Sequence, residues 1–573
     1  METRNLILAI VLSVGVLLLW TVFIEAPRQQ INQSVELSQQ DSIGEVTQLE
    51  TEELNQIEED LGIKKQSFET LENSLQKSTR VNIDTQSLEG SINLKGLKID
   101  DIVLKKYQET LDENSANIRV LSPLSTENGY EVSFGWFNDK DANFETPTSE
   151  SEWKLISSSN TLRENNELEF EWSNNTGQIY RTSISVDENY LFSINQKVIN
   201  NSSQEIIVNN ASKINRQTSP ALSGMFILHE GLLGVLEEKL ELIDYDDLKD
   251  DNETLNFESD NGWVGITDKY WLAALIPDQA KPFKAIYTYD NGYIAYYRSL
   301  NAQSIQSNGE FEVSSKIFIG AKEAKLIDQY QEDFNIYNFD LAIDWGWFYF
   351  LTKPLFYIIY YFSGISGNFG LAIIILTVIT RIIFFPLANW SFVSMAKMKM
   401  LQPEMTRIKE LHKEDRQQQQ KALMDLYKKE KVNPISGCLP ILIQIPFFFA
   451  IYKMLFVSIE MRHAPFYGWI QDLAAKDPTT IFNLFGLIPW DPPSFMIIGV
   501  WPVLMGITMY LQQKLNPAPP DPIQAKIFMF FPLFITILLA QFAAGLVIYW
   551  TTNNILSIIQ QWIITRRTTV KTN

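Results

Sequence analysis

Cysteine and histidine are almost absent from this chain, which removes several classes of chemistry. Cys438 is the one cysteine among 573 residues, and histidine occurs three times. A single cysteine excludes an intramolecular disulfide, and three histidines cannot build the usual His/Cys zinc site. Between residues 80 and 330 there is no Gly-x-Ser-x-Gly motif and no phosphate-binding loop. The sequence therefore predicts a protein that is not an enzyme, with no catalytic residue, cofactor or metal.

Positive charge is scarce in the first part of the chain. Residues 25 to 344 carry 26 basic and 56 acidic side chains, a net charge of −30, whereas the rest has a net charge of +9 within the total of −21. Because nucleic-acid binding needs a basic footprint, this balance argues against it as the main function. At 573 residues the chain also exceeds a single domain of about 150 residues. We expect two parts that lie in different solvents.

Long uncharged apolar runs are the feature that is present. Residues 5 to 24 carry no charge, and twenty residues suffice to cross ~30 Å of hydrocarbon. The run ends in Glu25-Ala26-Pro27 without a small-residue cleavage site, so an uncleaved anchor over 1–27 is expected. Five further runs predict transmembrane helices near 365–386, 437–457, 495–513, 527–543 and 545–564. The last two together are nearly twice one crossing, which favours a tight hairpin over a single long helix.

The distribution of Lys and Arg between the short loops predicts the orientation of these spans. The loop 391–436 holds ten basic residues, whereas the loop after the third span has only Arg462 and Lys476. By the positive-inside rule the basic loop and the tail 567–573 face the cytoplasm. Six spans then put both termini in the cytoplasm. They put residues 28–335 on the opposite side of the membrane, which is the periplasm if the cell is Gram-negative, and the helices would then lie in its inner membrane.

The predicted outer region 28–335 divides into two segments, and an aromatic segment follows it. Residues 28–79 are rich in Gln, Glu, Ser and Asn, which is typical of an acidic flexible linker. From 80 to 335 the sequence shows period-two alternation, as in 179–186 and 190–194, which predicts an antiparallel β-sandwich. Residues 336–364 are crowded with aromatic side chains and predict an interfacial amphipathic helix, or equally an ordinary aromatic belt.

Arg381 is the most informative residue of the predicted spans. It lies within the apolar run 371–386, where an arginine costs from about 2.5 to well over 10 kcal/mol. The six spans contain no Asp, Glu or His that could pair with it. Two explanations remain, a water-filled cavity and snorkelling of the side chain to the cytoplasmic surface.

Other polar residues in the spans favour a wet groove. Thr377 lies one turn before Arg381, and further polar residues occur in the third, fifth and sixth spans. They are Gln444, Gln541, Tyr549, Thr552, Asn553, Ser557 and Gln560. Such residues also serve as interhelical hydrogen-bonding groups, and this alternative stays open for each one alone.

The loop 391–436 predicts a basic helical hairpin. Its first segment carries an apolar methionine-rich face and several basic residues, including Met395, Lys397, Met398, Lys399, Met405 and Arg407. A second segment with an apolar face covers 422–427, and His412-Lys-Glu-Asp-Arg-Gln joins the two. Methionine faces can adapt to varied hydrophobic ligands, or they can pack their own hairpin. The basic face fits anionic lipid or ribosomal RNA.

Several longer motifs carry a family resemblance over about 340–566. They are Met395-Ala-Lys-Met-Lys-Met-Leu-Gln-Pro403, Lys431-Val-Asn-Pro434, Gly437-Cys-Leu-Pro-Ile-Leu-Ile-Gln-Ile-Pro446, the arginine before Ile-Ile-Phe-Phe-Pro386, and Gly545-Leu-Val-Ile-Tyr549 ahead of Asn553-Asn554. With these motifs the chain resembles the YidC/Oxa/Alb family of membrane protein insertases. The anchor and the large outer β domain further resemble its Gram-negative form.

The resemblance implies a fold and a site. The fold would be a polytopic α-helical membrane protein of six transmembrane helices, with a five-helix insertase core in 365–566 and a periplasmic β-supersandwich. The core would form a positively charged groove, open to cytoplasm and lipid and closed towards the periplasm. Its arginine would be Arg381, and Thr377, Gln444, Tyr549 and Asn553 would line it. Trp550, where relatives often have a second tyrosine, would contact substrate. The turn Phe542-Ala-Ala-Gly545 also departs from the family's usual Phe-Pro-Ser-Gly.

The resemblance also implies an activity and partners. The family inserts, folds and helps to assemble integral membrane proteins of the inner membrane, alone or with the Sec translocon and its accessory subunits. It needs no hydrolysis or cofactor. Its hairpin receives nascent chains and contacts the ribosome, although the short tail here has only Arg566, Arg567 and Lys571 as charges, which argues against strong ribosome binding through the tail. An ion-coupled transporter and a scaffold or adhesion protein are the alternative functions.

Overall fold

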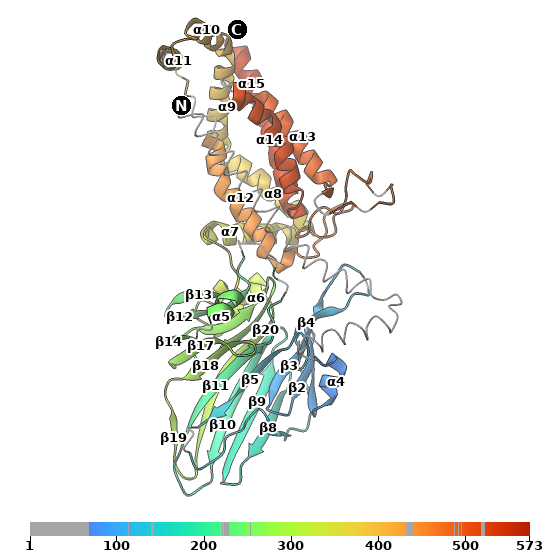
Figure 1. Cartoon of the computed structure of the whole chain (residues 1–573), viewed down its shortest axis with the longest axis vertical. Coiled ribbons are helices and arrows are strands. Elements are labelled where there is room, and N and C mark those ends of the chain that lie inside the picture. Colours follow the sequence, from blue (N-terminus) through green and yellow to red (C-terminus); the bar gives the residue numbers. More distant parts are fainter. Residues whose placement is uncertain are drawn as a thin grey trace, which may run out of the picture.

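The structure is a computed structural model that describes residues 68–572, with gaps at 113, 139–141, 221, 223–227, 252–253, 431, 434–438, 486, 491, 494–495 and 517–521. The predicted anchor 1–27 and most of the predicted linker 28–79 lie outside these residues. Cys438 and part of the motif that leads into the third predicted span also lie outside them. Figure 1 shows a β-rich body at one end of the molecule and a bundle of long helices at the other, with α7 (Tyr349–Ser366) between the two.

Eleven of the described strands form the first sheet. Their order is β14-β17-β18-β11-β5-β3-β2-β1-β7, with β19 paired to β11 and β4 to β3. Neighbours pair antiparallel except β1 and β7, which are parallel. The strands are β1 (Arg80–Asp84), β2 (Leu88–Asn93), β3 (Lys98–Gln108), β4 (Asn117–Leu121), β5 (Tyr130–Phe137), β7 (Thr161–Leu162), β11 (Ile206–Arg216), β14 (Leu255–Ser259), β17 (Phe283–Tyr289), β18 (Tyr293–Ser299) and β19 (Gln303–Ile305).

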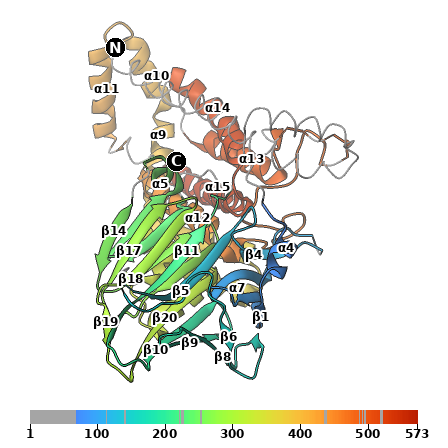
Figure 2. The ribbon, with the colours of Figure 1, turned by 60° about the horizontal axis from the view of Figure 1, so that its bottom comes forward.

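Nine of the described strands form the second sheet. Their order is β13-β12-β15-β16-β20-β10-β9-β8-β6, and all of these pairs are antiparallel. The strands are β6 (Lys154–Leu155), β8 (Glu167–Ser173), β9 (Gln178–Val186), β10 (Leu191–Asn200), β12 (Gly231–Leu236), β13 (Lys239–Asp244), β15 (Trp263–Thr267), β16 (Trp271–Ile276) and β20 (Gly309–Ala321). Figure 2 shows the long strands of this body from a second side.

The two sheets share one hydrophobic core. The predicted alternation is confirmed in β9 and β10, where buried and partly exposed residues alternate along the strand. Polar tips of core aromatics reach from one sheet to the other, since Tyr287 Oη donates to the carbonyl of Leu233 at 2.8 Å and Tyr130 Oη to that of Ile266 at 3.1 Å. Each of these tyrosines therefore fills the core with its ring and hydrogen-bonds a buried carbonyl with its hydroxyl.

Short helices flank this body. They are α4 (Leu71–Gln76), α5 (Tyr245–Asp251), α6 (Ala324–Asp333) and the 3-10 turn η2 (Phe339–Ala342). Helix α4 lies in the last part of the segment 28–79, which the composition predicts to be an unfolded linker. The chain is already ordered there, because Ser125 holds it at two points. Glu69 N donates to the Ser125 carbonyl, and the hydroxyls of Ser74 and Ser125 hydrogen-bond each other.

The remaining described helices belong to the second half of the chain. They are α7, α8 (Phe369–Ile383), α9 (Phe385–Met400), α10 (Gln402–Leu411), α11 (Arg416–Lys429), α12 (Leu439–Val457), the turn η4 (Ile459–Met461), α13 (Val500–Leu515), α14 (Pro522–Leu539) and α15 (Ala544–Thr572). Helix α7 begins inside the predicted interfacial segment 336–364 and ends two residues beyond it. Gly367, with φ +68°, ends it, and the Asn368 side chain caps α8 by accepting from Leu371 N at 3.0 Å.

Helices α8, α12, α13, α14 and α15 overlap the five apolar runs within 365–564. Within the described residues, no single helix alone is long and apolar enough to cross a membrane; α8 and α9 are so together, but they are bent by 67°. The two last spans are separate helices, as predicted, but they do not form a tight pair. Instead α13 packs against both α14 and α15. Between α14 and α15, residues 543–545 pair with the backbone of the segment 473–476.

Candidate functional site

Arg381 lies in the last turn of α8, immediately before the bend. The break follows from Pro386, which lacks an amide proton and whose ring would collide with the carbonyl one turn earlier if α8 continued. Phe384 has a backbone conformation outside the helical region, and α9 starts at the next residue. The bend places Arg381 at the junction of two helices and beside α15, which packs against both.

Asn553 of α15 is the partner of Arg381. The guanidinium donates from Nε to Asn553 Oδ1 at 2.8 Å and from Nη2 to the Asn553 carbonyl at 3.1 Å. The Asn553 carbonyl also accepts a hydrogen bond from Ser557 Oγ at 2.7 Å, one turn further along α15. Water alone is therefore not what solvates the arginine. Because both acceptors are neutral, the positive charge is held without being cancelled.

Arg381 faces a small pocket between α8, α9, α12 and α15. Thr380, Phe384, Leu387, Ala388, Gln444, Phe447, Tyr549 and Asn553 line it together with the arginine. The Tyr549 hydroxyl hydrogen-bonds the Gln444 side chain and lies close to the guanidinium. The pocket has a volume of about 40 Å³, enough for a few waters at roughly 10–15 Å³ each. It is too small for a peptide segment in this conformation.

Four of the six predicted groove residues thus meet, and two do not. Arg381, Gln444, Tyr549 and Asn553 share the pocket. Thr377 is fully buried and donates to the Ile373 carbonyl of its own helix at 2.7 Å. Trp550 lies on another side of α15. It packs against the cluster of Met505, Leu539 and Val547 and stands edge-on to Phe448, with ring centroids 4.7 Å apart.

Sequence reasoning missed the walls of this pocket. Phe384 and Phe447 stand edge to face with centroids 5.1 Å apart and connect the end of α8 to α12. Phe384 lies within the motif that ends at Pro386, and Phe447 directly follows the motif that ends at Pro446. Their positions beside these prolines were the signal in the sequence that could have indicated the pocket walls. A single cation between apolar walls can attract an anionic or polar group. The pocket residues offer no nucleophile paired with a base, so the arrangement suits binding rather than bond cleavage.

The polar residues of α15 divide between this pocket and interhelical bonding. Asn554 Nδ2 donates to Thr508 Oγ1 at 3.3 Å, and Gln561 Nε2 donates to Asn516 Oδ1 at 2.9 Å, both on the α13 side. For these residues the interhelical role is the one that the structure displays. Asn553 combines the two functions, since it joins α15 to α8 and faces the pocket.

The predicted hairpin is present but differs in its first arm. The first arm is interrupted at Leu401, because Pro403 cannot continue α9, and so α9 ends and α10 begins. Met395 does not lie on the hairpin at all. It is buried with Ala388, Phe392 and Ile564, where α9 packs against α15.

The arms of the hairpin proper are α10 and α11, joined at the predicted connection. Met405 is buried between them and its sulfur accepts from Tyr427 Oη at 3.8 Å. This methionine packs its own hairpin, which is one of the two alternatives that the sequence left open. Met398 is partly exposed, and the basic residues Lys397, Lys399 and Arg407 are exposed.

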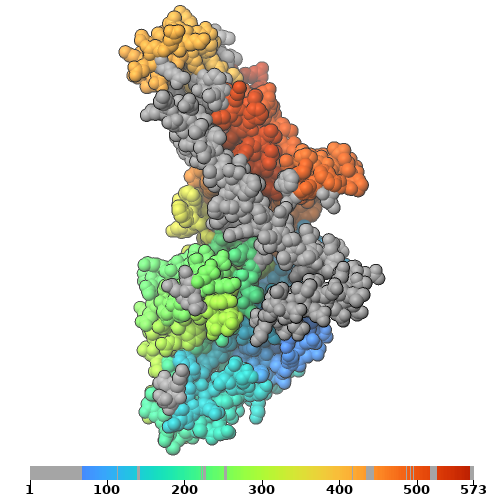
Figure 3. Space-filling view, in the orientation of Figure 1, coloured from blue at the N-terminus to red at the C-terminus, as the bar shows by residue number. Residues whose placement is uncertain are grey.

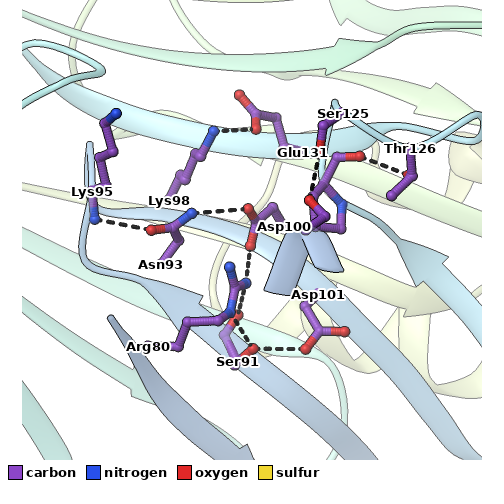
Figure 4. Close-up of polar contacts among 12 residues, drawn as sticks. Arg80, Ser91, Asn93, Lys95, Lys98, Asp100, Asp101, Ser125, Thr126 and Glu131 are labelled. Atoms are coloured by element: carbon purple, nitrogen blue, oxygen red, sulfur yellow. Dashed lines mark hydrogen bonds and ion pairs between the residues drawn. The ribbon is translucent and has the colours of Figure 1, made fainter. Parts of the chain in front are cut away.

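The acidic β-rich body offers no competing site at its buried carboxylates. Figure 4 shows that these carboxylates are paired with basic or hydroxyl groups. Arg80 forms an ion pair with Asp100, Lys98 Nζ lies 2.7 Å from Glu131 Oε2, and Ser91 Oγ donates to Asp101 at 2.6 Å. These groups hold β1, β2, β3 and β5 together. Within the described residues no group of three or more His, Cys, Asp or Glu could hold a metal.

Comparison with known proteins decides the family. The family model described as "60Kd inner membrane protein" matches residues 361–571, and that described as "YidC periplasmic domain" matches residues 80–358. "Membrane protein insertase YidC" from Pelagibacter ubique is 48% identical over 100% of both chains, and its counterpart from Rickettsia rickettsii is 45% identical over 98% of this chain and 99% of that one. The chain belongs to the YidC family of membrane protein insertases.

A solved structure, "Active YidC insertase crystal structure with the first transmembrane domain resolved", aligns with 84% of this chain and 92% of its own, with a TM-score of 0.37 and 18% identity. The matches to the YidC family confirm the resemblance seen in the motifs. They also confirm that the protein is not an enzyme, because the family is named for insertion and not for a covalent reaction. Membrane proteins and the lipid bilayer are thus what it acts on, and its β-rich part corresponds to the family's periplasmic domain. The transporter and scaffold alternatives are set aside.

Proposed function

We propose that this protein inserts, folds and helps to assemble integral proteins of the inner membrane, alone or with the Sec translocon, by admitting polar segments to the Arg381 pocket. The observation that supports this is a partly buried cation with neutral partners. Arg381 is held by the amide and carbonyl of Asn553, and the predicted spans contain no acidic residue to cancel its charge. An uncancelled charge in an apolar bundle attracts an acidic or polar segment of a substrate.

Admission requires the helices around the pocket to separate. The space beside Arg381 is about 40 Å³, so α8, α12 and α15 must move apart before Gln444, Tyr549 and Asn553 can face a peptide. The polar segment then crosses less hydrocarbon, because water and these side chains replace part of the bilayer. Burial of the substrate's apolar helix in lipid supplies the free energy. Thr377 and Trp550, which lie outside the pocket here, take part only after such a movement.

The topology we propose has six transmembrane helices with both termini in the cytoplasm. The anchor 1–27 and five helices in the core 365–566 cross the membrane, and residues 28–335 are periplasmic, with the two sheets of 80–335 as a β-sandwich. The aromatic segment 336–364 lies at the outer interface. The ten basic residues of 391–436 support the cytoplasmic placement of the hairpin. There the hairpin receives nascent chains and meets the ribosome, with Arg407 of α10 and the exposed Lys397 and Lys399 at the end of α9 as contacts.

Insertion of a small single-span substrate into proteoliposomes tests the proposal. With Arg381→Ala we expect insertion of substrates with acidic translocated segments to fall about tenfold or more, the effect of losing ~1.4 kcal/mol. Arg381→Lys keeps the charge and should retain most of the activity.

Asn553→Asp is the informative companion variant. It keeps a side chain of the same size beside Arg381 but converts a neutral acceptor into a carboxylate, so it should cancel the charge while preserving the fold. Loss of insertion with unchanged thermal stability supports an electrostatic role. If Arg381→Ala and Asn553→Asp both insert every substrate as well as wild type, the electrostatic step is wrong.

A further inference from the structure

The segment between α12 and α13 carries a cluster of large apolar side chains with no core to join. Seven residues form what we call the apolar tip: Ile481, Phe482, Leu484, Phe485, Leu487, Ile488 and Trp490. Their exposed fractions run from 36% to 83%, with Leu487 the highest. Scattered exposed apolar residues need no explanation, but a contiguous cluster of this size in a folded loop indicates a contact surface.

The base of this loop is firmly fixed. The buried Asp477 accepts from Thr479 N at 3.0 Å and from Trp501 N, at the start of α13, at 3.0 Å. Ile481 N donates to the carbonyl of Ile498 at 3.1 Å, so the two arms of the loop are joined at the first residue of the tip. The tip is therefore held out from the bundle by a rigid base and is not a frayed end.

The backbone of the tip also favours outward presentation of apolar groups. Phe485 N donates to the Thr480 carbonyl and Ile488 N to that of Asn483, both at 3.0 Å, which closes compact turns. Leu484 and Phe485 adopt φ values of +47° and +60°, which bulky residues rarely accept. Such backbone strain persists where contacts of the surrounding structure hold the residue in that conformation.

The lipid bilayer is the occupant that these observations favour. The tip residues carry no charge, and from 478 to 513 the sequence contains one charged residue, Asp491. The apolar surface continues onto α13, where Leu504, Ile507 and Leu511 are 40% to 51% exposed. Exposed Tyr467 and Trp469 lie in the same loop, and these residue types concentrate where hydrocarbon meets water. A protein partner would instead meet a polar, charged rim.

The position of the loop agrees with this choice. Figures 1 and 3 show the orange loop projecting sideways beside the end of α13 that lies nearer the β-rich body, at the level of α7. In the proposed topology, on which this inference rests, that level is the outer interface of the membrane. We infer that the apolar tip inserts into the acyl-chain region of the outer leaflet and anchors the outer end of α13 there.

Fluorescence quenching of the full-length protein in liposomes tests the inference. Cys438→Ser removes the one native thiol, and an environment-sensitive fluorophore is then attached at Leu487→Cys. Because Leu487 is 83% exposed, the label disturbs no packing. Ile507→Cys, on the outward face of α13, is the lipid-facing control. Ser307→Cys, exposed in the turn between β19 and β20, is the aqueous control.

We expect the label at Leu487→Cys to be quenched by lipids with a shallow acyl-chain nitroxide and to be several-fold less quenched by iodide than that at Ser307→Cys. Iodide quenching equal to that at Ser307→Cys, with no quenching by lipid, would place the tip in water and overturn the inference. Shielding from both quenchers means that protein covers the tip and likewise overturns it.

The control on α13 separates this inference from the proposed topology. If Ile507→Cys is quenched by nitroxide lipid and Leu487→Cys is not, the topology stands and only the membrane-inserted tip is wrong. If neither label meets lipid, the proposed topology fails and the inference fails with it. Phe485→Cys and Ile488→Cys provide the depth of the tip, and both should respond as Leu487→Cys does.

Discussion

At the scale of single residues, local chemistry was visible in the sequence but its partners were not. Arg381 stood out because an arginine in an apolar run must be solvated, and this follows from the residue alone. Its partner Asn553 is 172 positions away, and amides also occur elsewhere in the spans. A choice among amides depends on which helix faces α8, which no local pattern encodes.

Glu460 offers a prediction about pH. Burial, with the nearby carboxylate of Glu323, raises the pKa of Glu460 from 4.5 to about 7, although its Oε1 accepts from Ala324 N at 2.9 Å. Between these pH values the folded protein keeps a proton that the unfolded chain has lost. Stability therefore falls as pH rises from about 4.5 to 7, by up to about 3 kcal/mol.

Glu460→Gln keeps the acceptor and removes the titration. We expect the variant and wild type to melt alike at pH 5, and the variant to melt higher at pH 7.5, in thermal unfolding of detergent-solubilised protein. Measurements above pH 7.5 are excluded because burial also lowers the pKa of Lys322 and of Lys269 to about 8. A constant difference in melting temperature across pH 5 to 7.5 would show that Glu460 does not titrate in this range.

At the scale of elements, helices and strands were predictable where their signals are local. Alternation predicted β9 and β10, and proline at 386 marked the end of α8, because both effects act between residues a few positions apart. The break between α9 and α10 was missed although Pro403 marks it, since the methionine pattern continues across it. The start of α13 at Val500 was also missed by five residues. Its signal lies in another segment.

The missing signal for α13 is Asp477, which supports a prediction. The N-cap position is Gly499, which has no side chain to cap with, and a Cβ there would collide with the Asp477 carboxylate. Asp477 accepts from Trp501 N instead, and from Trp469 Nε1 at 3.1 Å. We expect Asp477→Ala to cost at least about 2 kcal/mol of stability.

Thermal unfolding again provides the measurement. Gln471→Ala, at an exposed position of the same loop, is the matched control and should change the melting temperature little. Asp477→Asn retains one acceptor oxygen and should fall between the two. Equal melting of Asp477→Ala and Gln471→Ala would mean that the cap does not stabilise α13.

At the scale of the whole molecule, the β-rich body is joined to the helices by specific polar contacts. Lys453 Nζ of α12 lies 2.6 Å from Asp344 Oδ2, and Lys353 of α7 lies 2.9 Å from Asp328 and 2.8 Å from Asp340. Arg462, after α12, donates to the carbonyl of Gln108 at the end of β3 at 2.6 Å. The order of the predicted domains along the chain said nothing about such a joint.

A double-mutant cycle tests the Lys453–Asp344 contact. Each of Lys453→Met and Asp344→Asn leaves the other group without its ionic partner in this contact, so each should destabilise the protein. The double variant should lose less than the sum, with a coupling of about 1–3 kcal/mol. The exposed pair Lys95–Glu150 is the control, and its coupling should stay below about 1 kcal/mol. Additive effects at Lys453 and Asp344 would contradict a shared role.

The class of the molecule, the approximate extents of its long helices and of β9 and β10 and, through the motifs, its family could be predicted from the sequence. These depend on hydrophobic period, charge and proline, which act over neighbouring residues. The tertiary structure alone decided that Asn553 holds Arg381, that Thr377 and Trp550 lie outside the pocket, and that the apolar tip has no core to join. These outcomes depend on which helix faces meet, and contacts between distant segments are selected by packing of the whole chain.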